Sequence, residues 1–287
     1  MKRLIVHADD LGADEARNAG IFEAIEAGSV TAASIMANGP AFEDCLRRIA
    51  SLNGAPLSFG VHLNLTEGRP LRPGLKILAG ADGCFFGKQE GHRRLMNRDG
   101  EALKNEIRME FAAQIQALRD AGVRLDHLDG HQHVHIFPAV IDATVRAAGK
   151  FGIPWIRIPE EPIPSGGMAP DDPSLREEAE IFSRFAAGAR IRLRGETMKT
   201  ADHFRGLYLK GRLSPARFER TLQTLPPGLT ELMVHPGRAP VGPIQDRFSA
   251  FSNRDRQEEL DLLTSGDFQR MLEKYDVRLT PFPEVRP

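Results

Sequence analysis

Short apolar runs alternate along the chain with longer segments in which apolar residues recur every three or four positions. The short runs have the length and composition of buried strands, and the longer ones have the period of amphipathic helices. We predict seven strands: Arg3–Ala8, Ser29–Ala37, Leu57–Leu63, Val123–Leu128, Trp155–Pro159, Thr230–Val234 and Val277–Pro281.

The longer segments predict helices between the strands. Ala16–Ala27 and Glu101–Ala121 place apolar residues on one face, and each is followed by a glycine, which favours a helix C-terminus. Pro138 and Pro215 occupy positions typical of a first helical turn, and Ser214 precedes the second proline as a candidate cap. Alternating strands and helices indicate an α/β protein with a parallel sheet.

Two segments interrupt this alternation. Glu67–Gly100 is rich in glycine and arginine, and Glu160–Leu207 is rich in proline at first and then basic. Neither has the character of a linker between domains, and the chain shows no internal repeat. We therefore expect one domain over residues 1–287, with excursions at 67–100 and 160–207 that line a cleft.

Composition limits the partners of the protein. The chain has 287 residues, 41% hydrophobic and 27% charged, which is enough apolar material for the core of a globular α/β barrel. A formal net charge of −1 predicts no binding to nucleic acid or to an anionic membrane. Two cysteines, Cys45 and Cys84, are too few for a disulfide framework.

The apolar runs also bear on location. The N-terminal run stops at His7, which is too short for a secretory signal, and no stretch reaches the length of a membrane span. We expect a cytoplasmic protein with no transmembrane segment. The sequence leaves a homo-oligomer open.

Candidate chemistry follows the strands. Four apolar runs lead directly into histidine or aspartate and then into glycine, proline or asparagine: at Asp9-Asp10, at His62, at the stretch 126–135 and at His235. In an α/β barrel the carboxyl ends of the strands converge on one face. We therefore expect these polar groups to meet in one site.

The adjacent carboxylates of Asp9 and Asp10 have two interpretations. Such a pair can be a solvated turn or a helix N-cap. Directly after an apolar strand, one carboxylate can instead bind an ion while the other faces a water molecule on that ion and acts as a base. The spacing does not say which aspartate has which part.

Three histidines lie within five residues, at His131, His133 and His135. All three share a face in extended chain, whereas only His131 and His135 share one in a helix. Burying them without partners would be costly, which favours a metal or a hydrogen-bond network over a surface histidine tract. One ion rarely binds all three, so the others are candidates for substrate contact or ligand support.

Two further histidines stand alone. His62 could be an ordinary core histidine, but its place at a strand end makes it a candidate ligand. His235 precedes Pro236-Gly237, which forces a turn, and it is either a structural turn residue or a general acid for a leaving amine.

One carboxylate and two histidines leave positions on an ion open for water and substrate, which is typical of a catalytic metal site. Mixed nitrogen and oxygen ligands suit zinc, cobalt, nickel or manganese, and they tolerate magnesium. The native ion is not defined by the sequence.

The same residues carry a family resemblance. The stretches His7–Gly12, Gly60–Thr66, His127–His135 and His235–Gly237 are similar in order and spacing to the motifs of the YdjC/ChbG family of carbohydrate deacetylases. This resemblance implies an α/β fold, a distorted TIM-like (β/α) barrel with about seven parallel strands. It also implies metal-dependent removal of acetyl groups from N-acetylated sugars such as chitooligosaccharides.

The resemblance further implies individual roles. Asp10, His62 and His131 correspond to the metal ligands of the family, with magnesium or zinc as the divalent ion, and Asp9 corresponds to its base. We expect the other polar residues near these motifs to bind substrate or to support the ligands: His133, His135, Asn64, Asp129 and Arg157.

Two other stretches, Trp155–Pro162 and Asp202–Leu213, resemble the branch of this family associated with hopanoid biosynthesis. That branch implies a glycolipid substrate, an N-acetylglucosamine attached to a hopanoid. The expected partner of the protein is therefore an N-acetylated carbohydrate or glycolipid.

Three other functions fit the same residues. A non-catalytic sugar-binding protein would use the barrel without chemistry. A metal-free glycosidase would place Asp9 or Asp10 opposite a second carboxylate, either Asp126 or Asp129. A metal-dependent phosphoesterase would need basic groups near the site, and the candidates are Arg157, Arg190, Arg192 and Arg194.

Overall fold

Eight parallel strands form one sheet in the part of the chain that the structure, a computed structural model, describes: residues 1–52, 57–164, 169–239, 248 and 253–284. The strands are β1 (Lys2–Leu11), β2 (Ala32–Ile35), β3 (Ser58–Leu63), β4 (His127–Gly130), β5 (Trp155–Ile156), β6 (His203–Arg205), β7 (Gly228–Val234) and β8 (Val277–Leu279). Every ladder between them is parallel, as the alternation of strands and helices predicts.

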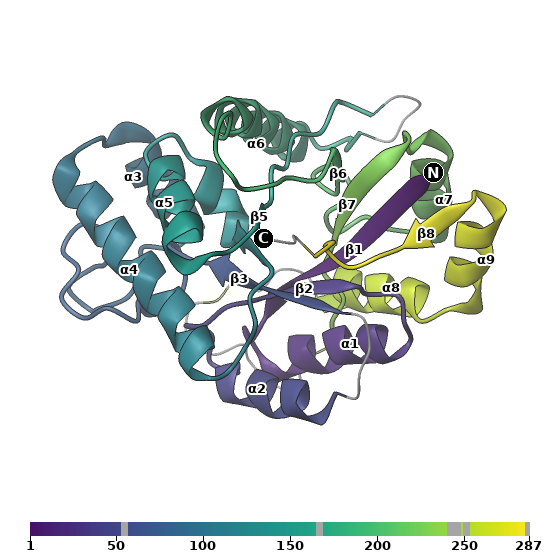
Figure 1. Ribbon diagram of the computed structural model, residues 1–287, viewed down its shortest axis with the longest axis horizontal. Coiled ribbons are helices and arrows are strands. Elements are labelled where there is room, and N and C mark those ends of the chain that lie inside the picture. Colours follow the sequence, from purple (N-terminus) through teal and green to yellow (C-terminus); the bar gives the residue numbers. More distant parts are fainter. Residues whose placement is uncertain (53–56, 165–168, 240–247, 249–252, 285–287) are drawn as a thin grey trace.

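Strand β1 pairs with three other strands of the sheet, whose hydrogen-bonded order is β5-β4-β3-β2-β1-β7-β6 with β8 off this path. One edge of β1 pairs with β7 from Lys2 to Ala8. Its other edge pairs first with β8, from Lys2 to Leu4, and then with β2, from His7 to Leu11. The seven strands of the main path curl into a half-barrel, a distorted form of the (β/α) barrel (Figure 1).

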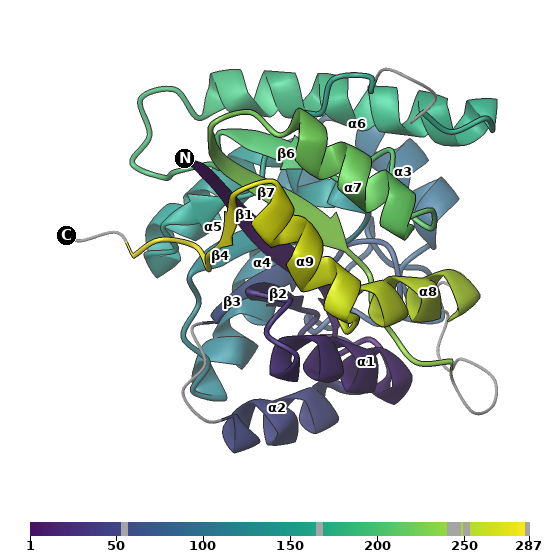
Figure 2. The same ribbon diagram turned by 90° about the vertical axis from the view of Figure 1, so that its right-hand side faces the viewer.

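Helices surround this sheet on the outside (Figures 1 and 2). They are α1 (Glu15–Glu26), α2 (Phe42–Ser51), α3 (Lys88–Asn97), α4 (Glu101–Asp120), the 3₁₀ helix η1 (His131–Ile136), α5 (Ile141–Phe151), α6 (Pro173–Arg192), α7 (Pro215–Thr224), α8 (Asn253–Leu263) and α9 (Gly266–Lys274). Apolar side chains of both layers, including Val6, Phe111 and Phe218, form a continuous buried cluster. Within the described ranges, no helix combines the length and apolar character that a membrane crossing requires.

Local sequence sets the ends of the helices. Helix α7 begins after Ser214, whose hydroxyl accepts a hydrogen bond from the backbone N–H of Arg217 at 3.4 Å, with Pro215 in the first turn. Helix α4 ends at Asp120, and Gly122 follows in the left-handed region with φ of 77°. Both ends agree with the helices predicted from the sequence.

Four predicted strands are shorter than expected. The strands predicted at Ser29–Ala37 and Val277–Pro281 are reduced to β2 and β8, and the other two are β4 and β5. The strand predicted from Val123 starts only at His127, because the backbone N–H of Val123 donates to the carbonyl of Leu118 at the end of α4 (3.0 Å). The strand predicted at Trp155–Pro159 ends at Ile156. After β5 the backbone N–H of Glu160 donates to the carbonyl of Ile158 (2.8 Å), so in both places a local hydrogen bond lies within a run that is apolar enough for a longer strand.

Two connections also differ from the prediction. Pro138 lies in the turn before α5, which begins at Ile141, so its assignment to a first helical turn is wrong. Strand β6 was not predicted, because its three residues have polar side chains at both ends, His203 and Arg205. A strand this short gives no recognisable apolar run.

The two excursions contain helices of their own. Helix α3 lies in the first and α6 in the second, of which residues 165–168 lie outside the described part. Helix α6 contacts η1 and α5. Lys88 of α3 and Glu178 of α6 face a common cavity at the carboxyl ends of the strands.

The contact between β3 and β4 leaves no room for a side chain at Gly60. A Cβ atom there would lie 2.2 Å from Cδ2 of His127, the register partner of Gly60 in β4. We expect Gly60→Ala to lower the free energy of unfolding by about 1–3 kcal/mol, because the buried His127 ring must move. Urea unfolding monitored by circular dichroism measures the change.

The matched control is Gly188→Ala in α6, where an added Cβ meets nothing within 4 Å. Alanine is the better helix former, so this variant should equal or exceed the wild type in stability. A Gly60→Ala protein as stable as Gly188→Ala would contradict the packing described for β3 and β4.

Candidate functional site

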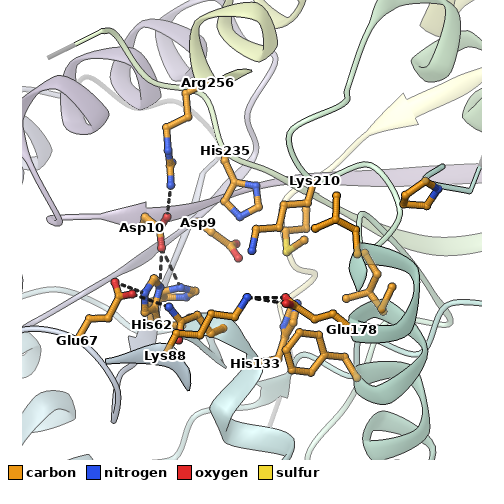
Figure 3. Close-up of a pocket in the computed structure, with 18 residues that line it drawn as sticks. Asp9, Asp10, His62, Glu67, Lys88, His133, Glu178, Lys210, His235 and Arg256 are labelled. Carbon is orange, nitrogen blue, oxygen red and sulfur yellow. Dashed lines mark hydrogen bonds and ion pairs between the residues drawn. The ribbon is translucent and has the colours of Figure 1, made fainter. Parts of the chain in front are cut away.

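A cavity of about 240 Å³ lies at the carboxyl ends of the central strands (Figure 3). Its wall includes Asp9 and Asp10 from β1, His62 from β3, His131 from η1 and His235 from the turn after β7. None of these five residues is more than 6% exposed. The strand ends that the sequence places at one face therefore meet in a single buried site.

A backbone irregularity brings both aspartates to this cavity. Neighbouring residues of a strand normally point to opposite faces. Here the register of β1 against β2 shifts between Ala8 and Leu11, and Asp10 adopts a left-handed φ of 68°. The irregularity lets Asp9 and Asp10 line the same cavity from adjacent positions.

Asp10, His62 and His131 point toward one another. Oδ1 of Asp10 lies 2.9 Å from Nδ1 of His131 and 3.4 Å from Nε2 of His62. One ligand atom of each residue lies within 4.8 Å of the other two. Two imidazole nitrogens and one carboxylate oxygen at this spacing could hold a divalent ion and leave coordination positions open.

Each of the two histidines is held from behind by a buried carboxylate. Nδ1 of His62 lies 2.9 Å from Oδ1 of Asp129, and Nε2 of His131 lies 3.0 Å from Oε2 of Glu67. A carboxylate on the outer nitrogen is the usual support of a metal-binding histidine, because it fixes the ring and makes the inner nitrogen more basic. The inward atoms are therefore Nε2 of His62 and Nδ1 of His131.

The carboxylates of Asp10, Asp129 and Glu67 favour the protonated, positively charged form of these two rings. Burial alone would lower the pKa of His62, but Asp129 and Asp10 raise it to about 10. Burial also opposes protonation of His131, yet Asp10 and Glu67 raise its pKa. This centre attracts either ring protons or a metal cation, and binding of the cation would release the protons.

Asp10 divides its two oxygens between this centre and an arginine. Oδ2 accepts a hydrogen bond from Arg256 at 2.5 Å, and Nη1 of Arg17 lies 3.6 Å from the same oxygen. Burial alone would raise the pKa of Asp10, but His131 and Arg256 hold it well below its ordinary value. Asp10 is therefore an ionised carboxylate with one oxygen directed at the two histidines.

Asp9 has a different environment. Both of its oxygens accept hydrogen bonds from the guanidinium of Arg157, each at 2.7 Å. Arg157 is 1% exposed and also contacts Asp129 at 2.9 Å and Glu231 at 2.6 Å. The geometry thus favours Asp10 over Asp9 as an ion ligand, a distinction that sequence spacing does not make.

A second group of ligand atoms, from His7, Asp9 and Asp129, also lies within 4.8 Å. The Arg157 guanidinium already bonds two of these three residues, so the positive charge that the carboxylates need is in place. His7 is engaged as well, because its Nδ1 lies 2.7 Å from Oε1 of Glu231. This group is a buried ion-pair network.

A backbone kink splits the histidine cluster. Gln132 and His133 have left-handed φ values of 52° and 57° within η1. His131 and His133 line the cavity, whereas His135 is fully buried outside it. Asp10, Gln132 and His133 are three of the four non-glycine residues with positive φ in the described part, and each such conformation costs on the order of 1–3 kcal/mol. Backbone strain is concentrated at this site.

Arg157 and His135 lie outside the cavity wall, and Arg157 contacts Asp9, which lines it. His135 donates from Nε2 to the backbone carbonyl of Arg157 at 3.0 Å. Burial lowers the pKa of His135 to about 4, so this ring is neutral. Because neither residue lines the cavity, both fit the expected role of supporting the ligands and not that of binding substrate.

Asn64 organises the chain that carries Glu67. Its Oδ1 accepts hydrogen bonds from the backbone N–H groups of Thr66 (2.9 Å) and Glu67 (3.1 Å), and its Nδ2 donates to the Glu67 carbonyl (2.7 Å). The turn directs the Glu67 carboxylate toward His131. Asn64 thus acts on the site through Glu67.

His235 contributes a neutral imidazole. Its backbone N–H donates to Oε2 of Glu259 at 2.5 Å. Burial lowers the pKa of the ring to about 3, against the opposing charge of Asp9. His235 is therefore able to accept a proton before it donates one.

Several cavity residues were missed by the sequence analysis: Glu67, Lys88, Glu178, Lys210 and Arg256. Glu67 follows the end of β3 by four residues, and this position after a strand was a signal that could have identified it. The other four come from helices and a turn whose sequences carry no such signal.

Comparison with known proteins places these residues in context. The chain matches the family model described as YdjC-like protein over residues 3–274. Proteins named carbohydrate deacetylase from Mus musculus and Brevibacillus brevis are 34% and 26% identical to it, over 99% of this chain and 94% and 99% of their own lengths.

A solved structure from Enterococcus faecalis, of a protein named for cellobiose-phosphate cleavage, is also similar. Its TM-score is 0.73 at 24% identity, and the match covers 98% of this chain and 97% of that one. At this identity the similarity shows the fold alone.

Arg157→Met tests whether the buried carboxylates depend on one guanidinium. The variant leaves Asp9, Asp129 and Glu231 without their shared cation, so we expect the free energy of unfolding near pH 7 to fall by about 3–5 kcal/mol. Burial alone would raise the pKa values of Asp129 and Glu231, but Arg157 keeps them below their ordinary range. Such carboxylates stabilise the fold above their unfolded-state pKa and lose this effect as the pH falls.

The deficit of Arg157→Met should therefore persist from about pH 7 down to the unfolded-state pKa values of about 4 and shrink as the pH falls further, as measured by urea unfolding between about pH 7 and about pH 3. Arg124→Met is the control, because Arg124 is 72% exposed and pairs with Asp126 at the surface. Its effect should stay below about 1 kcal/mol. A pH-independent deficit in Arg157→Met would count against the ion-pair network.

Proposed function

The chain belongs to the YdjC-like family, and from this premise we propose that it is a metal-dependent hydrolase that removes acetyl groups from N-acetylated sugars. The observation that carries the proposal is the convergence of Asp10, His62 and His131 in a buried cavity, with Asp9 beside them. Relatives named carbohydrate deacetylase, aligned over nearly the full length, support the same class of reaction.

In this proposal Oδ1 of Asp10, Nε2 of His62 and Nδ1 of His131 would hold the ion. Two nitrogens and one oxygen suit zinc, and the carboxylates nearby also make magnesium acceptable. When bound, the ion would supply Lewis acidity, which polarises an amide carbonyl and makes a water molecule more acidic.

Asp9 is the general base. Its carboxylate lines the cavity beside Asp10, and its two hydrogen bonds to Arg157 fix its direction while leaving lone pairs for a proton. Asp9 takes a proton from the water molecule that attacks the acetyl carbon. The C–N bond then breaks, and the products are acetate and the free amine of the sugar.

His235 delivers a proton to the leaving amine. Because burial keeps its pKa at about 3, the ring is neutral at rest, and it first accepts the proton that Asp9 took from the attacking water, which returns Asp9 to its carboxylate form. It then passes this proton to the amine nitrogen. The oxygen of the attacking water ends in acetate, and its protons end on the amine.

The substrate in this proposal is an N-acetylated oligosaccharide or glycolipid. The similarity of the stretches 155–162 and 202–213 to the hopanoid-associated branch makes an N-acetylglucosaminyl hopanoid one candidate. His133 is positioned to contact such a substrate, because its ring lines the cavity and burial lowers its pKa well below the ordinary value.

The arginines named from the sequence give little support to a phosphoesterase. Arg157 is committed to three carboxylates. Arg190 pairs with Glu160 and Arg192 with Asp142, outside the cavity. These three arginines therefore have carboxylate partners, and Arg194 does not line the cavity. The basic groups that do line it are Lys88, which pairs with Glu178, Arg256, which pairs with Asp10, and Lys210.

A metal-free glycosidase is likewise poorly supported. Asp126 precedes β4 and lies in a surface hollow beside Arg124, at the end of the strand away from the site. Asp129 is fully buried behind His62. Neither carboxylate lies across the cavity from Asp9 or Asp10, as an acid and nucleophile pair requires.

Acetate release from a panel of N-acetylated sugars and glycolipids tests the reaction. We expect at least one compound to yield acetate and free amine in a one-to-one ratio. Prior dialysis against a chelator should reduce the rate at least about 100-fold, and added zinc or magnesium should restore it, because the ion supplies the Lewis acid. No acetate from any compound with any divalent ion would refute the deacetylase proposal.

Asp10→Asn and Asp9→Asn separate ion binding from proton transfer. Asp10→Asn should lose both bound metal and turnover, because the amide is a poor ligand. Asp9→Asn should retain metal but lose about 10²–10⁴-fold in kcat, the usual contribution of a general base. Elemental analysis beside acetate assays measures both quantities. Loss of metal in Asp9→Asn with retention in Asp10→Asn would reverse the assigned roles.

A further inference from the structure

The turn that carries His235 is held between two helices. On one side it is bonded to α8: the backbone N–H of His235 donates to Oε2 of Glu259 at 2.5 Å, and that of Gly237 donates to the carbonyl of Arg256 at 3.2 Å. On the other side lies Gly20 of α1, where a Cβ atom would be only 2.5 Å from Cα of Gly237. The turn therefore has no room to move toward α1, and hydrogen bonds hold it to α8.

Glu259 is the side chain that connects this turn to the other elements of the site. It is 2% exposed, and its carboxylate also accepts a hydrogen bond from the backbone N–H of Gly211, in the turn after β6. Three residues earlier on α8, Arg256 contacts Oδ2 of Asp10 at 2.5 Å. One turn of α8 thus relates the proposed acid, His235, to the proposed ion ligand, Asp10.

A second buried glutamate has the same chemistry at a different place. Glu161 is 3% exposed, and its Oε2 accepts hydrogen bonds from the backbone N–H groups of Gly206 (3.0 Å) and Leu207 (2.7 Å), just after β6. These contacts lie at the beginning of the turn after β6 and not at His235. Glu161 therefore shows what such a carboxylate does for the fold without a contact to the proposed acid.

The hydrogen bonds of these two glutamates do not fully compensate for their burial. Burial raises the pKa of Glu161 and of Glu259 to about 7, although backbone N–H groups and a nearby arginine act in the opposite direction. Burying a carboxylate at this cost is a poor way to stabilise a turn. It is a good way to fix the direction of a catalytic side chain, because misplacement by about 1 Å can cost about 100-fold in rate.

We propose that Glu259 is a positioning residue, whose carboxylate fixes the backbone of His235 and so directs its imidazole at the leaving amine of the substrate. This role rests on the proposed deacetylase function. Glu259 does not line the cavity, so it acts only through His235. A group that protonates the amine must lie within hydrogen-bond reach of that nitrogen while the C–N bond breaks, and a held backbone meets this requirement.

Glu259→Gln tests the role, because it keeps the size of the side chain but replaces one acceptor oxygen by an amide N–H₂ group. With the N-acetylated compound that gives the highest rate in the panel, we expect kcat for acetate release to fall about 100-fold. Bound metal, measured by elemental analysis, should be unchanged, since the three candidate ligands are untouched.

A double-mutant cycle with His235→Ala separates positioning from a purely structural effect. Once the imidazole is absent, Glu259→Gln has no acid left to displace, so it should lower kcat by about threefold or less. A residue that only stabilises the fold would lower kcat by the same factor in both backgrounds.

Glu161→Gln is the matched control. It alters an equally buried carboxylate with two backbone partners, and whatever it does to kcat should be the same with and without His235. Gly20→Ala provides a second route, because its Cβ displaces the same turn from the side of α1 and should show the same dependence on His235. It keeps the test decisive if Glu259→Gln does not fold.

Two results would overturn the positioning role and leave the deacetylase function standing. One is a wild-type kcat in Glu259→Gln. The other is a loss in Glu259→Gln or in Gly20→Ala that is equally large in the presence and absence of His235. Absence of acetate release by the wild type would instead defeat the function itself.

Discussion

The pairing of buried carboxylates with two buried arginines is the interaction on which the rest of the site depends. Asp9, Asp10, Asp129 and Glu231 follow or lie within central strands, and none is more than 3% exposed. Unpaired carboxylates in such a place would be protonated or would unfold the site. Arg157 joins Asp9, Asp129 and Glu231 in one network, and Arg256 contacts Asp10 separately.

This division of partners gives two adjacent, identical side chains different chemistry. Asp9 has both oxygens on Arg157, whereas Asp10 keeps one oxygen for the inward nitrogens of His62 and His131. The outer nitrogens of those rings are fixed by Asp129 and Glu67. Because Asp129 contacts both Arg157 and His62, Asp9 and the three candidate ion ligands belong to one connected set of buried charges. Such a set resists rearrangement, which is what a preorganised site requires.

The sequence predicts the fold well where burial of a strand produces a run of apolar residues. It predicts the fold poorly where local hydrogen bonds determine where a strand begins or ends. Strands β1, β3 and β7 are apolar runs because both faces are covered, while β6 lacks such a pattern. The run before β4 is apolar, but the backbone N–H of Val123 donates to the end of α4 and the strand starts only at His127. The strand-end residues Asp9, Asp10, His62, His131 and His235 could be found because topology brings strand ends together. Arg256 and Lys210 could not be predicted from the sequence, since a distant helix, α8, and the turn after β6 bring them to the cavity. The split of the histidine cluster likewise depends on left-handed backbone at Gln132 and His133, which no spacing indicates.

The central claim is that Asp10, and not Asp9, binds a catalytic ion together with His62 and His131. A crystal structure of the protein grown with zinc, with anomalous diffraction measured at the zinc edge, tests it most directly. The account predicts one strong anomalous peak about 2.0–2.2 Å from Oδ1 of Asp10, Nε2 of His62 and Nδ1 of His131, with Asp9 still bonded to Arg157. An ion bound by Asp9, or a cavity without any anomalous peak in zinc-saturated crystals, would contradict it.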